Sequence, residues 1–261
     1  MQADIFAKKK RNTLAFLLLL GAVTILAMII TEYNALKGFA SIPKAIQWGM
    51  ANFYPTAESL EKLPVILEKL QETLLVSIAA TTAAAVFALL FSIFGSNTTR
   101  INPFFGAITR GIATVFRNID VAAWALILLF SFGQSSLTGY FALFFGSFGF
   151  LTRAFTETID EVSGGSVEAL KATGAGYFSI IFQSVIPSSI PQLISWVLFM
   201  IETNIRSATL IGLLTGSGIG FTFNLYYKSL AYDTASLVVV VIIAAILLIE
   251  YASNYVRKVI L

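Results

Sequence analysis

A glutamate and an arginine stand four residues apart in the segment ETNIRSAT, at Glu202 and Arg206. At this spacing the two side chains lie on one face of a helix and can form an ion pair. Charges at membrane depth are costly, and they generally face the protein interior or a water-filled path. Two interpretations follow, a structural ion pair inside a helical bundle and the lining of a translocation path. The candidate path residues in this segment are Glu202, Asn204, Arg206, Ser207 and Thr209.

A second polar cluster, Arg117-Asn118-Ile119-Asp120, begins another apolar segment. An interfacial anchor followed by a helix cap explains this cluster without any ligand. Lining of a path is the alternative, and under it Arg117 and Asn118 are the candidate residues. Both clusters therefore depend on the elements that position them.

Several kinds of chemistry are excluded by residues that the chain lacks. It contains no Cys and no His, which excludes thiol chemistry, a Ser–His–Asp triad and a conventional zinc site. It also has no G-x-x-x-x-G-K-[ST] motif, so it does not bind ATP through a P-loop. We expect no catalytic residue, no metal and no cofactor in this chain. Energy for transport must then come from a partner ATPase or an ion gradient, and a channel would need none.

Composition identifies the class of protein. Of the 261 residues, 57% are hydrophobic and 12% are charged, and the mean hydropathy is +0.84. A soluble protein this apolar could not cover its surface, so we predict an integral membrane protein in contact with lipid. Basic residues held at one membrane face explain the net charge of +3, and we expect no nucleic-acid partner. The uncharged run from Asn12 to Thr31 follows four basic residues and predicts a retained anchor.

The predicted fold class is all-α, a polytopic transmembrane helical bundle with about six spans. Leucines at helical spacing between Leu60 and Leu74 predict an amphipathic helix on the membrane surface before the second span. The third span is expected to bend near residues 118–120. We predict one domain overall, with an anchor and external segment at 1–72 and a core of membrane-spanning helices at 73–261. The expected spans are about 13–30, 73–95, 103–132, 137–159, 188–214 and 234–254.

Basic residues predict the orientation of these spans. With the N-terminus inside, the cytoplasmic segments hold 11 Lys and Arg residues and the outside segments hold 5. This asymmetry follows the positive-inside rule. We therefore expect a multi-pass protein with both termini in the cytoplasm, and the polar loop at 160–187 on the same side.

That polar loop contains EALKATGAGYFSIIFQSVIP, residues 168–187. Ser166 is a plausible N-cap for a helix that ends before Gly174. A second short helix is predicted from Tyr177 to Val185, with Pro187 expected to stop it. A helix–turn–helix loop without a partner would look similar.

The spacing of Glu168, Ala169, Gly174 and Pro187 resembles the EAA loop of ABC importer permeases, although Leu170 replaces the second Ala. Residues 117–128, 168–187 and 202–220 together resemble the phosphonate-type permeases, which carry R-x-I-P-x-x-x-W-A, the EAA loop and E-x-N-x-R-S-A-T-x-x-G in this order. The resemblance covers about residues 100–261. Two positions depart from this pattern, because Asp120 replaces the expected Pro and Ser217 a Gly.

The resemblance implies a type I ABC importer permease in a bacterial inner membrane, with no catalytic activity of its own. The implied solute is phosphonate, phosphite or a related phosphorus oxyanion, and methionine or a quaternary amine is the alternative. Cationic and amide groups at Arg206, Asn204 and Arg117 favour the anion. The implied partners are an ATP-binding cassette ATPase dimer that binds ATP and Mg, a second permease copy, and an extracytoplasmic solute-binding protein. The residues implied to couple to the ATPase are Glu168, Ala169, Gly174 and Pro187.

Overall fold

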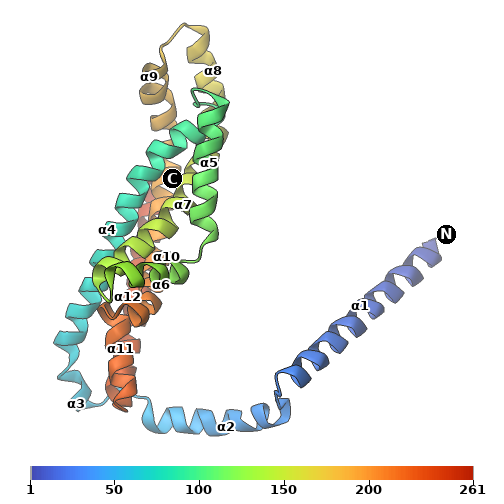
Figure 1. The fold of residues 1–261 in the computed structure, drawn as a ribbon, viewed down its shortest axis with the longest axis vertical. Coiled ribbons are helices and arrows are strands. Elements are labelled where there is room, and N and C mark those ends of the chain that lie inside the picture. Colours follow the sequence, from blue (N-terminus) through green and yellow to red (C-terminus); the bar gives the residue numbers. More distant parts are fainter. Residues whose placement is uncertain (1, 261) are drawn as a thin grey trace. The chain divides into compact units, whose positions relative to one another are not determined.

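Helices account for nearly all of the chain in the computed structural model, which describes residues 2–260 (Figure 1). No strand occurs within this range, so the predicted all-α class is confirmed. The α-helices are α1 Gln2–Ile30, α2 Ala35–Asn52, α3 Ala57–Leu60, α4 Leu63–Gly95, α5 Pro103–Asn118, α6 Val121–Phe132, α7 Ser136–Val162, α8 Gly164–Ala172, α9 Tyr177–Ile180, α10 Ile186–Thr215, α11 Gly218–Lys228 and α12 Tyr232–Ile260. A π-helix, Ile181–Val185, joins α9 to α10.

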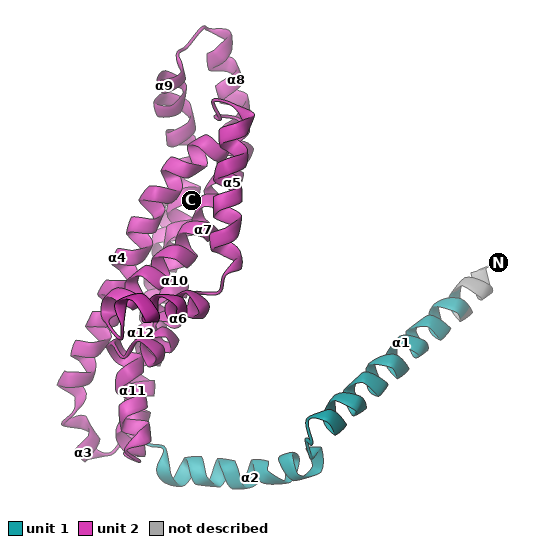
Figure 2. Cartoon of the chain, viewed as in Figure 1, with its two compact units in different colours: residues 1–54 teal, residues 55–261 magenta. Residues whose placement is uncertain are grey.

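The chain divides into two compact units, one ending at Tyr54 and the other beginning at Pro55 (Figure 2). The first contains α1, which carries the apolar anchor predicted for this region, and α2. The side chain of Asn34 caps α2 by accepting a hydrogen bond from the backbone N–H of Lys37 at 2.9 Å. Pro43 lies inside α2, and the helix continues through it to Asn52.

In the second unit, α4 is longer than the predicted span. Of the leucines expected on a separate surface helix, Leu60 ends α3 and the others lie in α4, which continues without a break from Leu63 to Gly95. Pro64 stands in the first turn of α4, where a missing backbone N–H costs no helical hydrogen bond. The predicted division between residues 72 and 73 lies within this helix.

The core of the second unit is built around α7, which contacts α4, α5, α6 and α10. One face of α4 is a stripe of small residues at helical spacing. Small side chains there let the backbones of α4 and α7 approach closely. Large side chains such as Phe148, Leu151 and Phe155 of α7 fill the space beside that stripe. The buried small residues of α4 are Ser77, Ala80, Thr81, Ala84, Ala88, Ser92 and Gly95.

Four helical segments of the described chain are long and apolar enough to cross a membrane, and there are five if the bent pair α5–α6 is counted as one span. The two members of that pair meet at 90°, at the break predicted near residues 118–120. The remaining expected span is α7, a 27-residue helix that is not among the segments apolar enough to cross by composition. Because neighbouring helices cover much of α7, its surface can carry buried Thr and Ser residues that lipid would not accommodate. The four segments are Lys8–Ile30, Leu63–Gly95, Tyr177–Thr215 and Tyr232–Ile260.

The predicted stop at Pro187 is wrong. The helix continues from Tyr177 to Thr215 through the π-helix, in which the backbone N–H of Ile186 donates to the carbonyl of Ile181, five residues earlier. Pro187 follows in the first turn of α10. A wider turn before the proline separates its ring from the preceding carbonyls, which removes the clash that would otherwise break the helix.

Candidate coupling loop and polar sites

Two short helices, α8 and α9, form the loop at one end of the second unit (Figure 1). Between them Gly174 has φ +79°, a left-handed conformation that favours glycine. The N–H of Gly174 donates to Lys171 O at 3.0 Å, and that of Ala175 donates to Leu170 O at 3.2 Å. This pair of bonds is a Schellman motif, and it ends α8. The predicted break at Gly174 is confirmed by this geometry.

The loop is fixed to the bundle by apolar and polar contacts. A small apolar cluster of Ile159, Val167, Ile180 and Val185 anchors it, and the Ser184 hydroxyl donates to the Ser166 hydroxyl at 2.7 Å. Ser166 lies inside α8, and the N-cap position belongs to Ser163, so the predicted cap is wrong. The four predicted coupling residues, Glu168, Ala169, Gly174 and Pro187, are all exposed.

Glu202 is the centre of a charged cluster. Its Oε1 accepts from Arg206 at 2.9 Å, which confirms the predicted i,i+4 pair, and its Oε2 accepts from Arg257 of α12 at 3.2 Å. The Glu202 side chain is 11% exposed and the Arg206 side chain is 48% exposed. Sequence reasoning missed Arg257 because it placed that residue in a cytoplasmic tail, whereas α12 extends past it.

The other polar residues of the same segment occupy different surroundings. Asn204 is 1% exposed, and its amide nitrogen donates to Thr81 of α4 at 2.7 Å and to Ser147 of α7 at 2.6 Å. It therefore joins three helices inside the core. Ser207 and Thr209 are half-buried.

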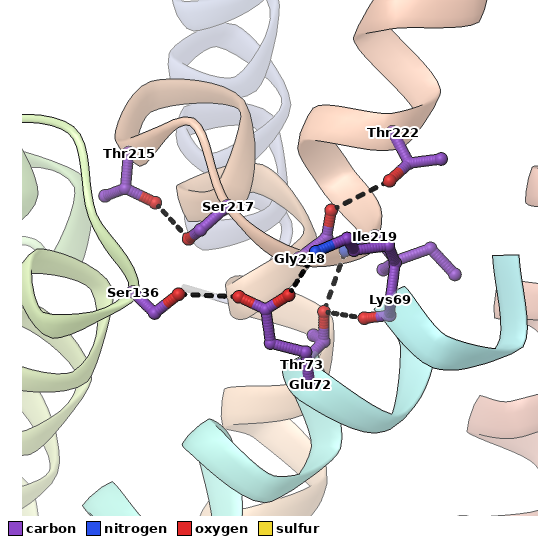
Figure 3. A network of polar contacts seen from close by, with 9 residues as sticks. All are labelled: Lys69, Glu72, Thr73, Ser136, Thr215, Ser217, Gly218, Ile219 and Thr222. Carbon is purple, nitrogen blue, oxygen red and sulfur yellow. Dashed lines mark hydrogen bonds and ion pairs between the residues drawn. The ribbon is translucent and has the colours of Figure 1, made fainter. Parts of the chain in front are cut away.

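A polar network holds the end of the 202–220 segment (Figure 3). Ser217, the N-cap residue of α11, makes no capping hydrogen bond with its own side chain. Instead α4 supplies the cap, because Glu72 accepts from the N–H of Gly218 and Thr73 accepts from the N–H of Ile219 at 2.9 Å. Glu72 also accepts from the Ser136 hydroxyl at 2.6 Å. Neither α4 residue was predicted, since a cap donated by another helix has no local sequence signal.

Arg117 and Asn118 lie at the end of α5, where the chain turns into α6. Asp120 caps α6 by accepting from Ala122 N–H at 2.8 Å. The rings of Phe116 and Trp124 stack across the corner, with centroids 5.2 Å apart. This corner places Arg117 and Asn118 in the wall of a pocket of about 370 Å³ between α5 and α7. No α10 residue lines the pocket, so the two predicted clusters are not brought together there.

Residues 88–260 match the family described as "Binding-protein-dependent transport system inner membrane component". The chain belongs to this family. It is thus a multi-pass inner-membrane component of a transport system, and the ATPase of such a system is a separate subunit. The resemblance to importer permeases is confirmed.

Named relatives agree with the family. The chain is 29% identical over 190 residues to "Phosphate-import permease protein PhnE" of Mycolicibacterium smegmatis, covering 73% of this chain and 36% of that protein. It is 27% identical over 255 residues to "Putative phosphite transport system permease protein HtxC" of Stutzerimonas stutzeri, covering 98% of this chain and 89% of that protein. The chain therefore spans about a third of the first relative and most of the second.

Solved structures share the fold. An inward-facing structure of the MetNI methionine ABC transporter matches 77% of this chain and 98% of its own chain, with a TM-score of 0.68 and 18% identity. This match confirms the type I importer permease architecture.

Proposed function

We propose that this chain is the translocation subunit of an ATP-driven importer for phosphonate, phosphite or a related phosphorus oxyanion. The observation that carries the coupling role is the exposed loop formed by α8 and α9, which a Schellman turn holds at one end of the bundle. A rigid pair of short helices can enter a cleft of an ATPase and transmit its movement. Glu168, Ala169, Gly174 and Pro187 are the proposed coupling residues.

The proposed assembly contains two copies of this chain, two ATPase subunits that bind ATP and Mg, and an extracytoplasmic solute-binding protein. Both termini and the loop at 160–187 face the cytoplasm in this arrangement, as the basic residues indicate. ATP-driven closure of the ATPase pair switches the permease between inward-open and outward-open states. The chain supplies the path and the coupling, and no covalent chemistry.

Two observations support a phosphorus oxyanion as the solute. The relatives described above are named for phosphate and phosphite, and one of them aligns along 98% of this chain. The chain also holds cationic groups in its polar sites, at Arg206 beside Glu202 and at Arg117 in the α5–α7 pocket. Cationic and amide linings favour anions over cations through their electrostatic potential. The proposed path residues are Glu202, Arg206, Ser207, Thr209, Arg117 and Asn118. Asn204, which is buried and bonded to α4 and α7, is assigned to the fold.

Reconstitution tests the proposal. The chain is assembled in liposomes with its genomically adjacent ATPase and binding protein, and ATP-dependent uptake is measured for methylphosphonate, phosphite, phosphate, methionine and a quaternary amine. We expect uptake of a phosphorus oxyanion. Uptake of methionine or the amine alone would assign the solute to the alternative class. Co-purification of two differently tagged copies checks the homodimer.

A further inference from the structure

The pocket between α5 and α7 contains arginines that have no acidic partner in the described fold. Three arginines line it, Arg110 and Arg117 from α5 and Arg153 from α7. Arg153 is paired with Glu157 at 2.6 Å. Neither of the other two forms an ion pair within the described part of the chain, and Arg110 donates only to the side-chain oxygen of Asn97, at 3.2 Å.

The second acid in the pocket does not balance these cations. Asp160 already accepts hydrogen bonds from the Ser96 hydroxyl at 2.6 Å, from Asn97 at 3.1 Å and from the N–H and hydroxyl of Thr98 at 3.0 Å. Its two oxygens are committed to the turn that follows α4. The side chain of Arg117 has no hydrogen bond or ion pair to any described residue, and Arg117 is exposed and lines the pocket. Its guanidinium is therefore available to a ligand.

An independent feature of the pocket also points to a ligand. Thr152 of α7 lines the pocket and is 1% exposed, and its hydroxyl oxygen is buried without a hydrogen-bond partner. Buried hydroxyls are nearly always hydrogen-bonded, because an unpaired one has lost its hydrogen bonds to water without gaining any in the protein. A hydroxyl can donate to an oxyanion, as the arginines do. Asn118 lies in the same wall, and its amide nitrogen donates to the backbone carbonyl of Thr114 at 2.8 Å.

We infer that the α5–α7 pocket is a binding site for a tetrahedral phosphorus oxyanion, held by Arg117 and Arg110 with the Thr152 hydroxyl as a further donor. Guanidinium groups bind phosphate oxygens in pairs, and the planar fork sets the geometry. The pocket volume of about 370 Å³ accommodates such an ion together with water. The shared chemistry has two sources, a free solute and the phosphate headgroup of an anionic lipid. The inference takes its solute class from the proposed function, and its test measures binding separately from transport.

The test uses the purified full-length chain in nanodiscs of phosphatidylcholine alone, titrated with inorganic phosphate and with methylphosphonate by calorimetry. We expect saturable binding that Arg117→Gln and Arg110→Gln each weaken roughly tenfold or more, because each removes a charge-assisted hydrogen bond. Thr152→Val should weaken binding by a factor of about 2–10, as for one neutral hydrogen bond. Thr152→Ser should retain it. Arg11→Gln, a matched change in the other unit, should leave the affinity unchanged.

A parallel set of nanodiscs with phosphatidic acid separates the two sources. If phosphatidic acid competes with phosphate in the wild type but not in Arg117→Gln, the site accepts a lipid headgroup. Binding that is the same in wild type, Arg117→Gln and Thr152→Val would overturn the site, and so would no binding of phosphate, methylphosphonate or phosphatidic acid. If the Thr152 hydroxyl binds only water, Thr152→Val should leave the anion affinity unchanged. That result would also count against the site. Failure of reconstituted uptake with intact Arg117-dependent binding would refute the proposed function alone.

Discussion

The carboxylate of Glu202 on α10 binds the guanidinium of Arg257 on α12 at 3.2 Å, across a separation of 55 residues in the sequence. The same carboxylate binds Arg206 through its other oxygen. One acid thus serves two bases, and the cluster keeps an excess of positive charge. Arg257, the less exposed of the two arginines at 27%, can hold Glu202 without help from Arg206.

This sharing predicts unequal effects on stability. Glu202→Gln should strongly lower the melting temperature, because it leaves Arg257 partly buried without its acid, and breaking a buried pair costs about 3–5 kcal/mol. Arg206→Gln should cost no more than about 1 kcal/mol, as for an exposed pair. Thermal unfolding of the purified variants measures both. Equal losses would show that Arg206 is a structural residue.

The same residues predict an effect on transport. Arg206→Gln should lower the rate of anion uptake while the folded yield stays near that of the wild type. Arg206→Lys should rescue uptake only in part, because the planar fork is lost. Uptake is measured per folded molecule. An Arg206→Gln variant that transports at the wild-type rate removes Arg206 from the path.

Asn204 is expected to act on the fold. Asn204→Ala removes the bonds to Thr81 and Ser147, and interhelical hydrogen bonds in membranes contribute about 0.6–1.7 kcal/mol. We expect a lower melting temperature, with transport per folded molecule largely retained. Thr81→Val should reproduce part of the decrease in melting temperature. Asn254→Ala, a change at an exposed position, should not lower it. A normal melting temperature with lost uptake would instead place Asn204 in the path.

The turn at Gly174 predicts a coupling defect. Gly174→Ala forces a side chain into a left-handed conformation at a cost of about 1–2 kcal/mol, although the space around it is open. Solute-stimulated ATPase activity and uptake should fall together, while the binding protein's affinity for its ligand stays the same. Gly176→Ala is the matched control, since Gly176 has φ −70° and equally open surroundings. Full coupling in Gly174→Ala would contradict the assignment of the loop.

Asp160 predicts a dependence of stability on pH. Burial alone would raise its pKa, but hydrogen bonds from the Ser96 hydroxyl and from the N–H groups of Thr98 and Asn97 outweigh this and hold the pKa below its ordinary value. A depressed carboxyl pKa contributes stability above the unfolded pKa, and this contribution is lost as pH falls through the folded pKa. Asp160→Asn should therefore be less stable than wild type at neutral pH, with the difference shrinking in acid. The exposed Glu161→Gln should show no such difference, and a constant gap at all pH values would disprove the linkage.

The orientation of the chain is testable because the sequence contains no Cys. Thr173→Cys in the α8–α9 loop should not react with a membrane-impermeant thiol reagent in intact cells, and it should react after the cells are opened. Ser229→Cys, between α11 and α12, should react from outside. Labelling of Thr173→Cys in intact cells would reverse the proposed topology.

Local patterns predicted the features that depend on neighbours in the sequence. The Gly174 break, the bend at residues 118–120 and the Glu202–Arg206 pair all follow from residue type and spacing within one or two turns. The apolar runs located the helices for the same reason. A signal of this kind reaches only a few residues along the chain.

Features that depend on how helices are rotated and packed could not be predicted in this way. Arg257 meets Glu202, and Thr73 caps α11, only because distant helices lie side by side. The error at Pro187 has a different source, since the effect of a proline depends on whether the turn before it is an α-turn or a π-turn.

The π-turn at Ile181–Val185 holds one residue more than an α-helical turn would, within a continuous helical rod from Tyr177 to Thr215. Each residue advances a helix by about 100° of azimuth. Converting that turn to α geometry would therefore turn α9 about the rod's long axis by roughly this angle, while α10 kept its register. Phe178 and Phe182, both exposed, would then face another direction. The direction in which the aromatic side chains of the loop point is thus set by the geometry of this one turn.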